Sequence, residues 1–412
     1  GWTHGAARRP RWWSGVVRRA GYDQPMDAIL GDCILDDLRR RKSFKWRAYP
    51  GDVLPAFVAE MDFDIAEPIK DAVRTALADG DCGYAHKGEL GEAFAAFATS
   101  RLGWSPDPEL VFPVPDVMTG IAEVLMALTK PGTGVVINPP VYPPFSMRIS
   151  LMGRKLVEAP LRRSDDAPGA GTGYDLDLEL LDRILSADDV GAYLLCSPHN
   201  PVGRVWSRDQ LTAVADICAR HGTVLIVDEI HAPLVLPGAR QVPVLSLDHE
   251  LTRRVIIFTS ASKGWNIPGL KCGIAVAGSA ETATILRDRW DALLASHLGV
   301  QATVAAFTSG QPWLDAMLAQ IDENRGLLTR LLSKHLPAVG YVPPEASFLA
   351  WLDCRLLGLG DDPAAAFLER GRVALSPGPD FGQEGRGYAR LNMGTSPDLL
   401  ADAIARMALA VG

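Results

Sequence analysis

The sequence predicts an α/β fold built around a mostly parallel sheet. Short runs rich in β-branched residues, each long enough for one buried strand, lie near positions 135, 193, 224 and 255. Segments with a helical pattern separate these runs, and strands that alternate with helices favour a parallel sheet. The chain has 412 residues, which is too long for one simple core, so we expect two domains.

The elements expected in the first third of the chain are mainly helices. An amphipathic pattern predicts a helix over 29–42, and a proline in the first turn marks a helix over 68–78. A helix over 90–101 precedes a short strand over 110–114. The next helix opens at 115–120 and ends near 128, with Asp116 as its cap.

The middle of the chain supplies most of the sheet. A buried strand over 135–137 comes first, and a glycine-rich surface loop over 162–174 receives no chemical role. Helices over 178–185 and 208–221 separate the following strands, and 275–278 adds another strand.

Helices and short strands complete the chain. Helical patterns dominate from 280 to about 336, with a break near Gly310 and Pro312. Short apolar runs predict strands at 348–352, 372–375 and 390–392. A closing helix is expected over 397–411.

The stretch 258–271 carries the first chemical signal. It places Ser260, Ser262, Lys263 and Lys271 directly after a buried strand. Burial disfavours the ammonium form of a lysine, so the Lys263 amine becomes a nucleophile toward a carbonyl. The serine hydroxyls and the charge of Lys271 suit a phosphate. Pyridoxal 5'-phosphate (PLP) needs such a pair of features, although a solvated loop with Lys263 facing water is the open alternative.

Two further strands end in polar residues. One runs into an Asn-Pro-x-Gly turn that begins at Asn200, and the next ends at Asp228. The carboxyl ends of strands form the ligand crevice of an open α/β sheet, so we expect these residues to converge on Lys263. A buried Asp228 needs a partner for its carboxylate, and a pyridinium nitrogen would be that partner. The carboxylate would in turn keep this nitrogen protonated. Asn200 and His231 can hydrogen-bond the phenolic oxygen of the cofactor.

Other candidate contacts follow from the same logic. The N-terminus of the helix after Asp116 offers the backbone amides of Val117 and Met118 to a phosphate. Tyr142, after the strand at 135–137, can stack on the cofactor ring. Arg390 can bind the α-carboxylate of an amino acid with two parallel hydrogen bonds, whereas a weak surface ion pair is the alternative.

The order of these motifs along the chain resembles one enzyme family. The motifs are Lys45-Trp46, 57–63, Gly83-Tyr84, 139–145, 200–203, 228–231, 260–263 and 388–392. They are similar to those of fold-type I PLP enzymes in the class I/II aminotransferase superfamily, and the resembling residues run from about Asp32 to Ala410. Within this superfamily, the sequence looks most like the cystathionine β-lyase, or C–S lyase, branch known as the MalY/PatB group.

The resemblance implies an architecture and a quaternary structure. It implies a mostly parallel central sheet flanked by helices, with a smaller α+β domain. The expected parts are a small-domain segment over 26–70, a large PLP-binding domain over 71–295, and a connecting helix with the rest of the small domain over 296–412. In this family a tyrosine at the position of Tyr84 reaches the cofactor phosphate of the neighbouring subunit, which implies a homodimer with shared active sites.

The resemblance also favours a reaction. Lys263 would remove the Cα proton of an amino-acid substrate, and a thiolate on Cβ could then leave. The residues alone do not separate this β-elimination from transamination, or from a tailoring reaction on an S-linked cysteine. The family likeness favours a C–S lyase that yields a thiol, pyruvate and ammonia. A regulatory role through protein contacts alone is a further alternative.

Composition excludes several other classes of protein. A net charge of −8 argues against a nucleic-acid surface, which needs concentrated basic charge. No apolar run reaches the roughly 18 residues of a membrane helix. The 6 cysteines lie far apart, as is typical of a reducing cytosol. We therefore expect a cytoplasmic protein with no nucleic-acid or membrane partner and no metal site.

The first 25 residues differ from the rest. Arginines surround a Trp12-Trp13 pair without periodicity, and the apolar centre is too short for a signal peptide. We expect a disordered extension or a misassigned start, with a lipid or partner contact as the alternative.

Overall fold

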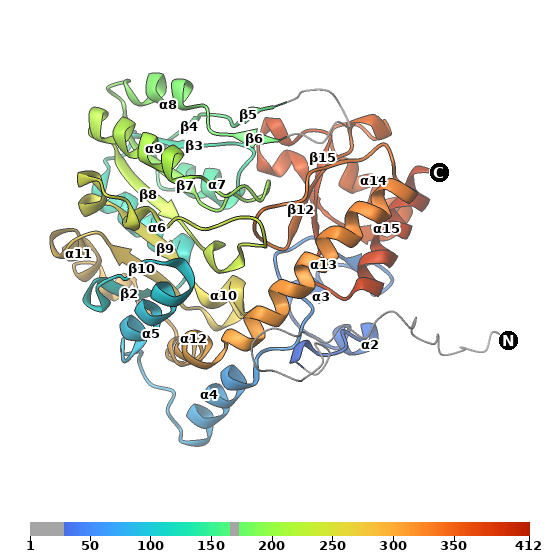
Figure 1. Ribbon diagram of the computed structural model, residues 1–412, viewed down its shortest axis with the longest axis horizontal. Helices are drawn as coiled ribbons and strands as arrows, with labels where there is room; N and C mark the ends of the chain where they lie inside the picture. The colour runs from blue at the N-terminus through green and yellow to red at the C-terminus, as the bar shows by residue number, and fades with distance from the viewer. Residues whose placement is uncertain (1–28, 165–172) are drawn as a thin grey trace.

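The computed structural model describes residues 29–164 and 173–412 (Figure 1). Its largest sheet has seven strands in the order β2-β10-β9-β8-β7-β3-β4. The strands are β2 (Val111–Val114), β3 (Gly134–Ile137), β4 (Lys155–Glu158), β7 (Val190–Cys196), β8 (Val224–Asp228), β9 (Ile256–Thr259) and β10 (Gly273–Ala277). Strand β10 pairs antiparallel with both of its neighbours, and the other pairs are parallel. The predicted mostly parallel sheet is therefore confirmed.

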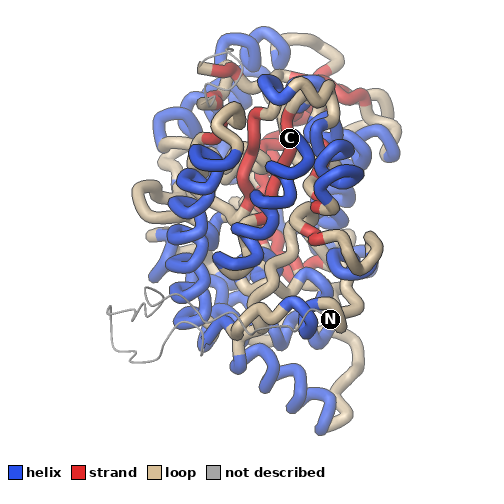
Figure 2. The backbone as a smooth tube through the Cα atoms, turned by 90° about the vertical axis from the view of Figure 1, so that its right-hand side faces the viewer, coloured by secondary structure: helices blue, strands red, loops and turns tan. Residues whose placement is uncertain are grey.

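Helices lie on both sides of the strands (Figure 2), and each face of the large sheet has its own hydrophobic core. The core on one face joins α6 (Val117–Leu128), α7 (Pro144–Leu151) and α11 (Ala280–Arg287) to Leu194 and Ile226 of the sheet. The core on the opposite face joins α8 (Leu178–Leu185) and α9 (Arg208–His221) to Tyr193 and Val227. Neighbouring residues of β7 and β8 thus enter different cores, as the alternation of side chains along a strand requires.

A smaller sheet lies beside the large one. It is antiparallel, in the order β11-β12-β15-β14, with β11 (Gly340–Tyr341), β12 (Leu349–Asp353), β14 (Ser376–Pro377) and β15 (Tyr388–Asn392). The helices α14 (Pro363–Gly371) and α15 (Pro397–Val411) pack against each other next to it. A separate pair joins β1 (Leu54–Pro55) to β13 (Val373–Ala374) in parallel, so the N-terminal segment lies with the C-terminal part. The domain boundaries at 70 and 295 stay a prediction.

Long helices link the two parts of the molecule. The helix α12 (His297–Ser309) packs against α4 (Glu67–Ala78) and α5 (Leu90–Phe97). The 25-residue α13 (Gln311–His335) then crosses to the small sheet, where it packs on α15 (Figure 1). The predicted break at 310–312 is real, because Gly310 ends α12 and a proline sits in the first turn of α13.

Three local predictions were wrong or incomplete. The helix expected over 29–42 is interrupted: Ile29 and Leu30 are helical, but Gly31 and Cys33 have φ of 76° and 47°, and only α2 (Leu35–Leu38) follows. The helix expected over 90–101 ends at Phe97 and continues as a π-helical turn over 98–102. The loop expected over 162–174 begins and ends in the paired strands β5 (Arg162–Arg163) and β6 (Tyr174–Asp175).

The predicted extension over 1–25 lies outside the described residues. Of the helices that the structure describes, none is long and apolar enough to cross a membrane. All six cysteines are free thiols, and four of them are buried.

Candidate active site

A cavity of about 400 Å³ lies where the large sheet faces the small one. Among the residues that line it are Val117, Met118, Tyr142, Asn200, Asp228, His231, Ser260, Ser262, Lys263, Lys271 and Arg390. These follow the carboxyl ends of β2, β3, β7, β8 and β9, with Arg390 added from β15. The structure thus brings every predicted site residue except Tyr84 to one cavity.

Lys263 lies in α10 (Ala261–Gly264), the single helical turn that follows β9. Its Nζ donates a hydrogen bond of 2.8 Å to the backbone oxygen of Ala59. Burial and the nearby Arg390 disfavour the ammonium form and lower the pKa of Lys263 to about 8. A fraction of this amine is therefore unprotonated at neutral pH and able to act as a nucleophile or a base.

Asp228 ends β8 and is only 3% exposed. Its Oδ1 accepts a hydrogen bond of 3.0 Å from the Ile230 amide. Desolvation raises the pKa of Asp228 to about 7, against the opposing effects of that hydrogen bond and of Lys263. A cation placed against this carboxylate would relieve the cost of its burial.

One end of the cavity is suited to an anion. Asp116 caps α6 by accepting a hydrogen bond of 2.8 Å from the Thr119 amide, as predicted, and its other oxygen pairs with Lys271. Burial opposes ionisation of Asp116, but the hydrogen bonds from Lys271 and Thr119 outweigh it and lower its pKa. The first amides of α6, at Val117 and Met118, have no acceptor within their own helix.

The two predicted serines differ in their contacts. The Ser260 hydroxyl donates to the Cys272 carbonyl over 2.7 Å and accepts from the Ser262 amide over 2.9 Å. Ser260 therefore holds the loop that carries Lys263, and its proton is directed at protein. Ser262, which is half-buried, is the serine whose hydroxyl remains for a bound group.

His231 is a neutral imidazole at the cavity wall. It is 3% exposed, and burial together with the charges of Lys263 and Arg390 lowers its pKa to about 3. Within the described residues its Nδ1 has no hydrogen-bond partner. A buried polar atom without a partner is rare, so this nitrogen is a position for a hydrogen bond to a bound molecule.

Arg390 is a buried guanidinium in the middle of β15. It donates to Asn200 Oδ1 over 3.1 Å, to Ser376 Oγ over 3.1 Å and to the Phe57 oxygen over 3.2 Å. Burial lowers the pKa of Arg390 to about 10, so it stays charged at neutral pH. No carboxylate in the described part of the chain pairs with it, and its Nε has no partner there. A buried cation without an anion suits the carboxylate of a small ligand.

The segment 57–62 forms the wall opposite the sheet, and side chains hold its carbonyl oxygens. Asn392 donates to the oxygens of Val58 and Glu60 over 2.8 and 2.7 Å. Lys45, paired with the buried Asp62 at 2.7 Å, also donates to Glu60. The carbonyl of Ala59, which receives Lys263, is thereby fixed in place.

Two aromatic predictions have different outcomes. Tyr142 lines the cavity and packs edge-on against Phe145 at a ring distance of 5.8 Å. Tyr84 is 95% exposed and lies outside the cavity of its own chain, so its contact with a neighbouring subunit stays a prediction.

Sequence reasoning missed Arg148, Met147 and Ala59. Arg148 and Met147 lie one helical turn after Pro144, and all three residues of α7 line the cavity. The helical spacing was a usable signal for this face. The contact of Ala59 could not be seen, because it is made by a backbone oxygen 204 positions from Lys263.

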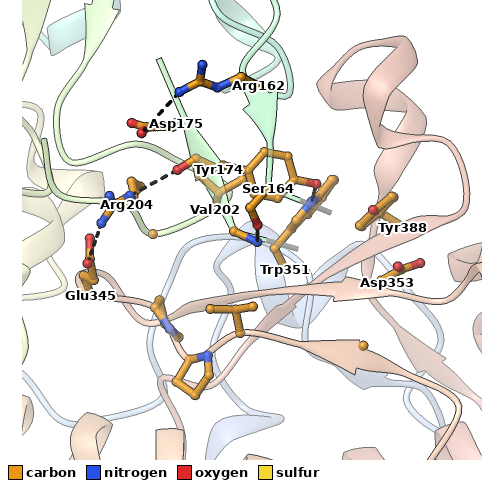
Figure 3. Close-up of a pocket in the computed structure, with 16 residues that line it drawn as sticks. Arg162, Ser164, Tyr174, Asp175, Val202, Arg204, Glu345, Trp351, Asp353 and Tyr388 are labelled. Carbon is orange, nitrogen blue, oxygen red and sulfur yellow. Dashed lines mark hydrogen bonds and ion pairs between the residues drawn. The ribbon is translucent and has the colours of Figure 1, made fainter. Parts of the chain in front are cut away.

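A second cavity of about 390 Å³ lies between β5, β6 and β12 (Figure 3). Its two arginines pair with acids of the same lining, Arg162 with Asp175 at 4.0 Å and Arg204 with Glu345 at 2.6 Å, and its Asp353 pairs with Arg355. No lysine is among the described residues that line it. This cavity therefore lacks the nucleophile that distinguishes the first one.

The residues of the first cavity fit PLP. They offer an amine for its aldehyde, a carboxylate for its ring nitrogen and a helix N-terminus for its phosphate. The unpartnered Nδ1 of His231 provides a separate observation that a polar group belongs there.

Comparison with known proteins agrees with this geometry. Residues 63–407 match the family described as aminotransferase class I and II. The chain belongs to this family. The predicted superfamily and its fold are thus confirmed.

Individual relatives show which branch of the family the chain resembles. The chain is 42% identical to a putative cystathionine beta-lyase of Mycobacterium leprae, over 93% of this chain and 98% of the relative. It is 35% identical to cystathionine beta-lyase PatB of Bacillus subtilis, over 87% and 93% of the two chains. The crystal structure of a putative PLP-dependent beta-cystathionase from Corynebacterium diphtheriae has a TM-score of 0.85 and 32% identity, covering 92% of this chain and 98% of that one. The predicted cystathionine β-lyase branch is confirmed by these relatives.

Proposed function

We propose that this protein is a PLP-dependent C–S β-lyase. It would cleave cystathionine or another cysteine S-conjugate by α,β-elimination into a thiol, pyruvate and ammonia. The observation that carries the proposal is the cavity that joins Lys263, Asp228 and Arg390. The relatives named cystathionine beta-lyase, at 42% and 35% identity, support the choice of reaction.

In this proposal three residues handle the reacting atoms. Bound PLP supplies an electron-withdrawing ring that stabilises negative charge at Cα. Arg390 would bind the α-carboxylate. Lys263 would hold the cofactor in the resting enzyme, and its Nζ, set free when the substrate amine displaces it, would take the Cα proton. The Cβ–S bond then breaks with its electron pair on sulfur, and the released 2-aminoacrylate hydrolyses to pyruvate and ammonia. Asp228 keeps the ring nitrogen protonated through its negative charge.

The remaining residues position the cofactor. The amides of Val117 and Met118, the Ser262 hydroxyl and Lys271 would hold its phosphate. Asn200 and His231 would bind the phenolic oxygen, and Tyr142 would lie against the ring. We further propose a cytoplasmic homodimer in which Tyr84 of each subunit contributes to the other site.

Transamination is the second candidate, because it uses the same residues and the family bears the aminotransferase description. The two reactions differ in what they consume. A lyase releases pyruvate and a thiol from the substrate alone, whereas an aminotransferase requires an added keto acid. A regulatory protein that acts through protein contacts alone would neither release pyruvate nor transfer an amino group.

An assay on purified protein tests the proposal. The protein should absorb visible light after incubation with PLP, and cystathionine should yield pyruvate and a thiol without a keto acid. The variant Lys263→Ala should lose both the absorbance of covalently bound cofactor and the pyruvate. Amino-group transfer only with a keto acid would replace this proposal by transamination, and failure to bind PLP would favour the regulatory role.

A further inference from the structure

Arg148 is an unpaired cation at the wall of the candidate active site. It shares one face of α7 with Pro144 and Met147, and all three line the cavity. Its side chain is half-buried. Among the described residues, no hydrogen-bond acceptor and no carboxylate contacts its guanidinium.

The other cations near the two cavities have partners or a role. Lys271 pairs with Asp116, and Lys263 donates to the Ala59 oxygen. In the second cavity Arg162 and Arg204 each face a carboxylate (Figure 3). Arg390 is unpaired too, and the proposed function assigns it the α-carboxylate. Arg148 is then the remaining guanidinium in the site without an anion.

The roles assigned to the other lining charges point in the same direction. The charged residues that line the first cavity are Asp116, Arg148, Asp228, Lys263, Lys271 and Arg390. In the proposed function Asp228 serves the ring nitrogen, Lys271 the phosphate and Arg390 the α-carboxylate. Arg148 is the cation to which no anion is assigned, and the apolar atoms of Pro144 and Met147 beside it suit the carbon chain of a substituent on sulfur.

We propose that Arg148 determines substrate specificity by binding an anionic group at the far end of the S-substituent. The inference rests on the proposed function, because it requires a cysteine S-conjugate held by Arg390 at its α-carboxylate. The preferred substrates are then cysteine S-conjugates that end in a carboxylate, and neutral S-alkyl cysteines are poorer. A guanidinium suits this role because it binds carboxylates in a planar, two-point geometry.

Pairs of substrates of equal shape and different charge test the proposal. S-carboxymethyl-L-cysteine is compared with S-carbamoylmethyl-L-cysteine, and S-(2-carboxyethyl)-L-cysteine with its carbamoyl analogue, by pyruvate release. The wild-type enzyme should favour the carboxylate of at least one pair by about 10- to 100-fold in kcat/KM, as expected for a charged hydrogen bond. Arg148→Gln should abolish that preference, mainly through KM, because the guanidinium binds the S-substituent and takes no part in breaking the Cβ–S bond.

Control variants separate this role from others. Arg148→Lys should keep part of the preference. Arg183→Gln removes the same charge from an exposed position on α8 and should leave the preference for the carboxylate substrate unchanged. The affinity of the apoprotein for PLP, followed by visible absorbance, should be the same with and without Arg148.

Two results would overturn the inference and leave the lyase intact. One is a wild-type enzyme whose kcat/KM is the same for the carbamoyl and the carboxylate member of each pair. The other is an Arg148→Gln variant that binds PLP more weakly and slows both members of each pair equally, since Arg148 would then serve the phosphate. If no S-conjugate yields pyruvate, the proposed function fails and this inference fails with it.

Discussion

At the scale of single residues, the site contains ionisable groups whose charged forms are destabilised by burial. Desolvation raises the pKa of Asp228 to about 7 and lowers that of Lys263 to about 8. The adjacent Glu229 is also buried, and its pKa rises to about 8. Its Oε1 accepts a hydrogen bond of 2.8 Å from the Val244 amide, so it serves the loop after β8. Asp228 and Lys263 instead face the cavity, where a ligand can complement them.

We predict that Asp228→Asn stabilises the apoprotein and weakens PLP binding. Folding raises the pKa of Asp228 from 3.8 to about 7, so the folded protein favours the protonated carboxyl. The protein therefore loses stability as the pH rises from 3.8 to about 7 and the carboxyl ionises. The amide removes that cost, which is of order 2–4 kcal/mol above pH 7 and smaller at pH 5. Thermal unfolding of the apoprotein at pH 8 and pH 5 measures the gain.

The same variant has a second readout. Titration of the apoprotein with PLP should show at least tenfold weaker binding, because the ring nitrogen loses its anionic partner. An Asp228→Asn apoprotein that is less stable than the wild type at pH 8, or that binds PLP equally well, would contradict the assignment. Glu229→Gln is the control for PLP binding: the pKa of Glu229 is raised by burial as well, but its carboxylate faces the Val244 amide rather than the cavity, so the variant should bind PLP as the wild type does.

At the scale of elements, the segment 57–62 closes the cavity and depends on one buried ion pair. The side chains of Lys45 and Asp62 are 1% and 4% exposed and lie 2.7 Å apart. Removing one partner of such a pair leaves an uncompensated buried charge. Lys45 also donates to the Glu60 oxygen, next to the carbonyl that receives Lys263.

We predict that Lys45→Met lowers the free energy of unfolding by about 3–5 kcal/mol and that adding Asp62→Leu restores most of it. Chemical denaturation of the single and double variants measures both effects. The exposed pair Lys155–Asp189, with both side chains 57% exposed, is the matched control. Lys155→Met should cost less than about 1 kcal/mol. Equal losses in the single and double Lys45 variants would show that the pair itself is unimportant.

Elements with local signals were predicted well from sequence. The bounds of α8, α9 and α15 match the expected ranges, because each begins at a side-chain cap: Asp177, Ser207 and Ser396. The region 29–42 failed because a positive φ at Cys33 has no sequence signature. The site residues at strand ends were predictable from topology. The hydrogen bonds from Asn392 and Lys263 to the segment 57–62 join residues hundreds of positions apart and were not.

At the scale of the whole molecule, the cavity needs both ends of the chain. The segment after β1 supplies Val58 and Ala59, and β15 supplies Arg390. The parallel pairing of β1 with β13 brings these regions together. Tyr84 is the one predicted site residue that does not line the cavity of the single chain, and it is largely exposed. A second copy of the chain would explain its position.

We predict that two inactive variants complement each other when their subunits mix. If Tyr84 contacts the cofactor of the other subunit, a dimer of one Lys263→Ala and one Tyr84→Ala chain has one doubly defective site and one intact site. Random mixing should recover about a quarter of the wild-type pyruvate release, because half of the dimers are mixed and half of their sites are intact. The chains are unfolded and refolded together, with each variant refolded alone as the control. Recovery no greater than the sum of the separate variants would place Tyr84 outside the partner's site, and a monomer in sedimentation would exclude the shared site altogether.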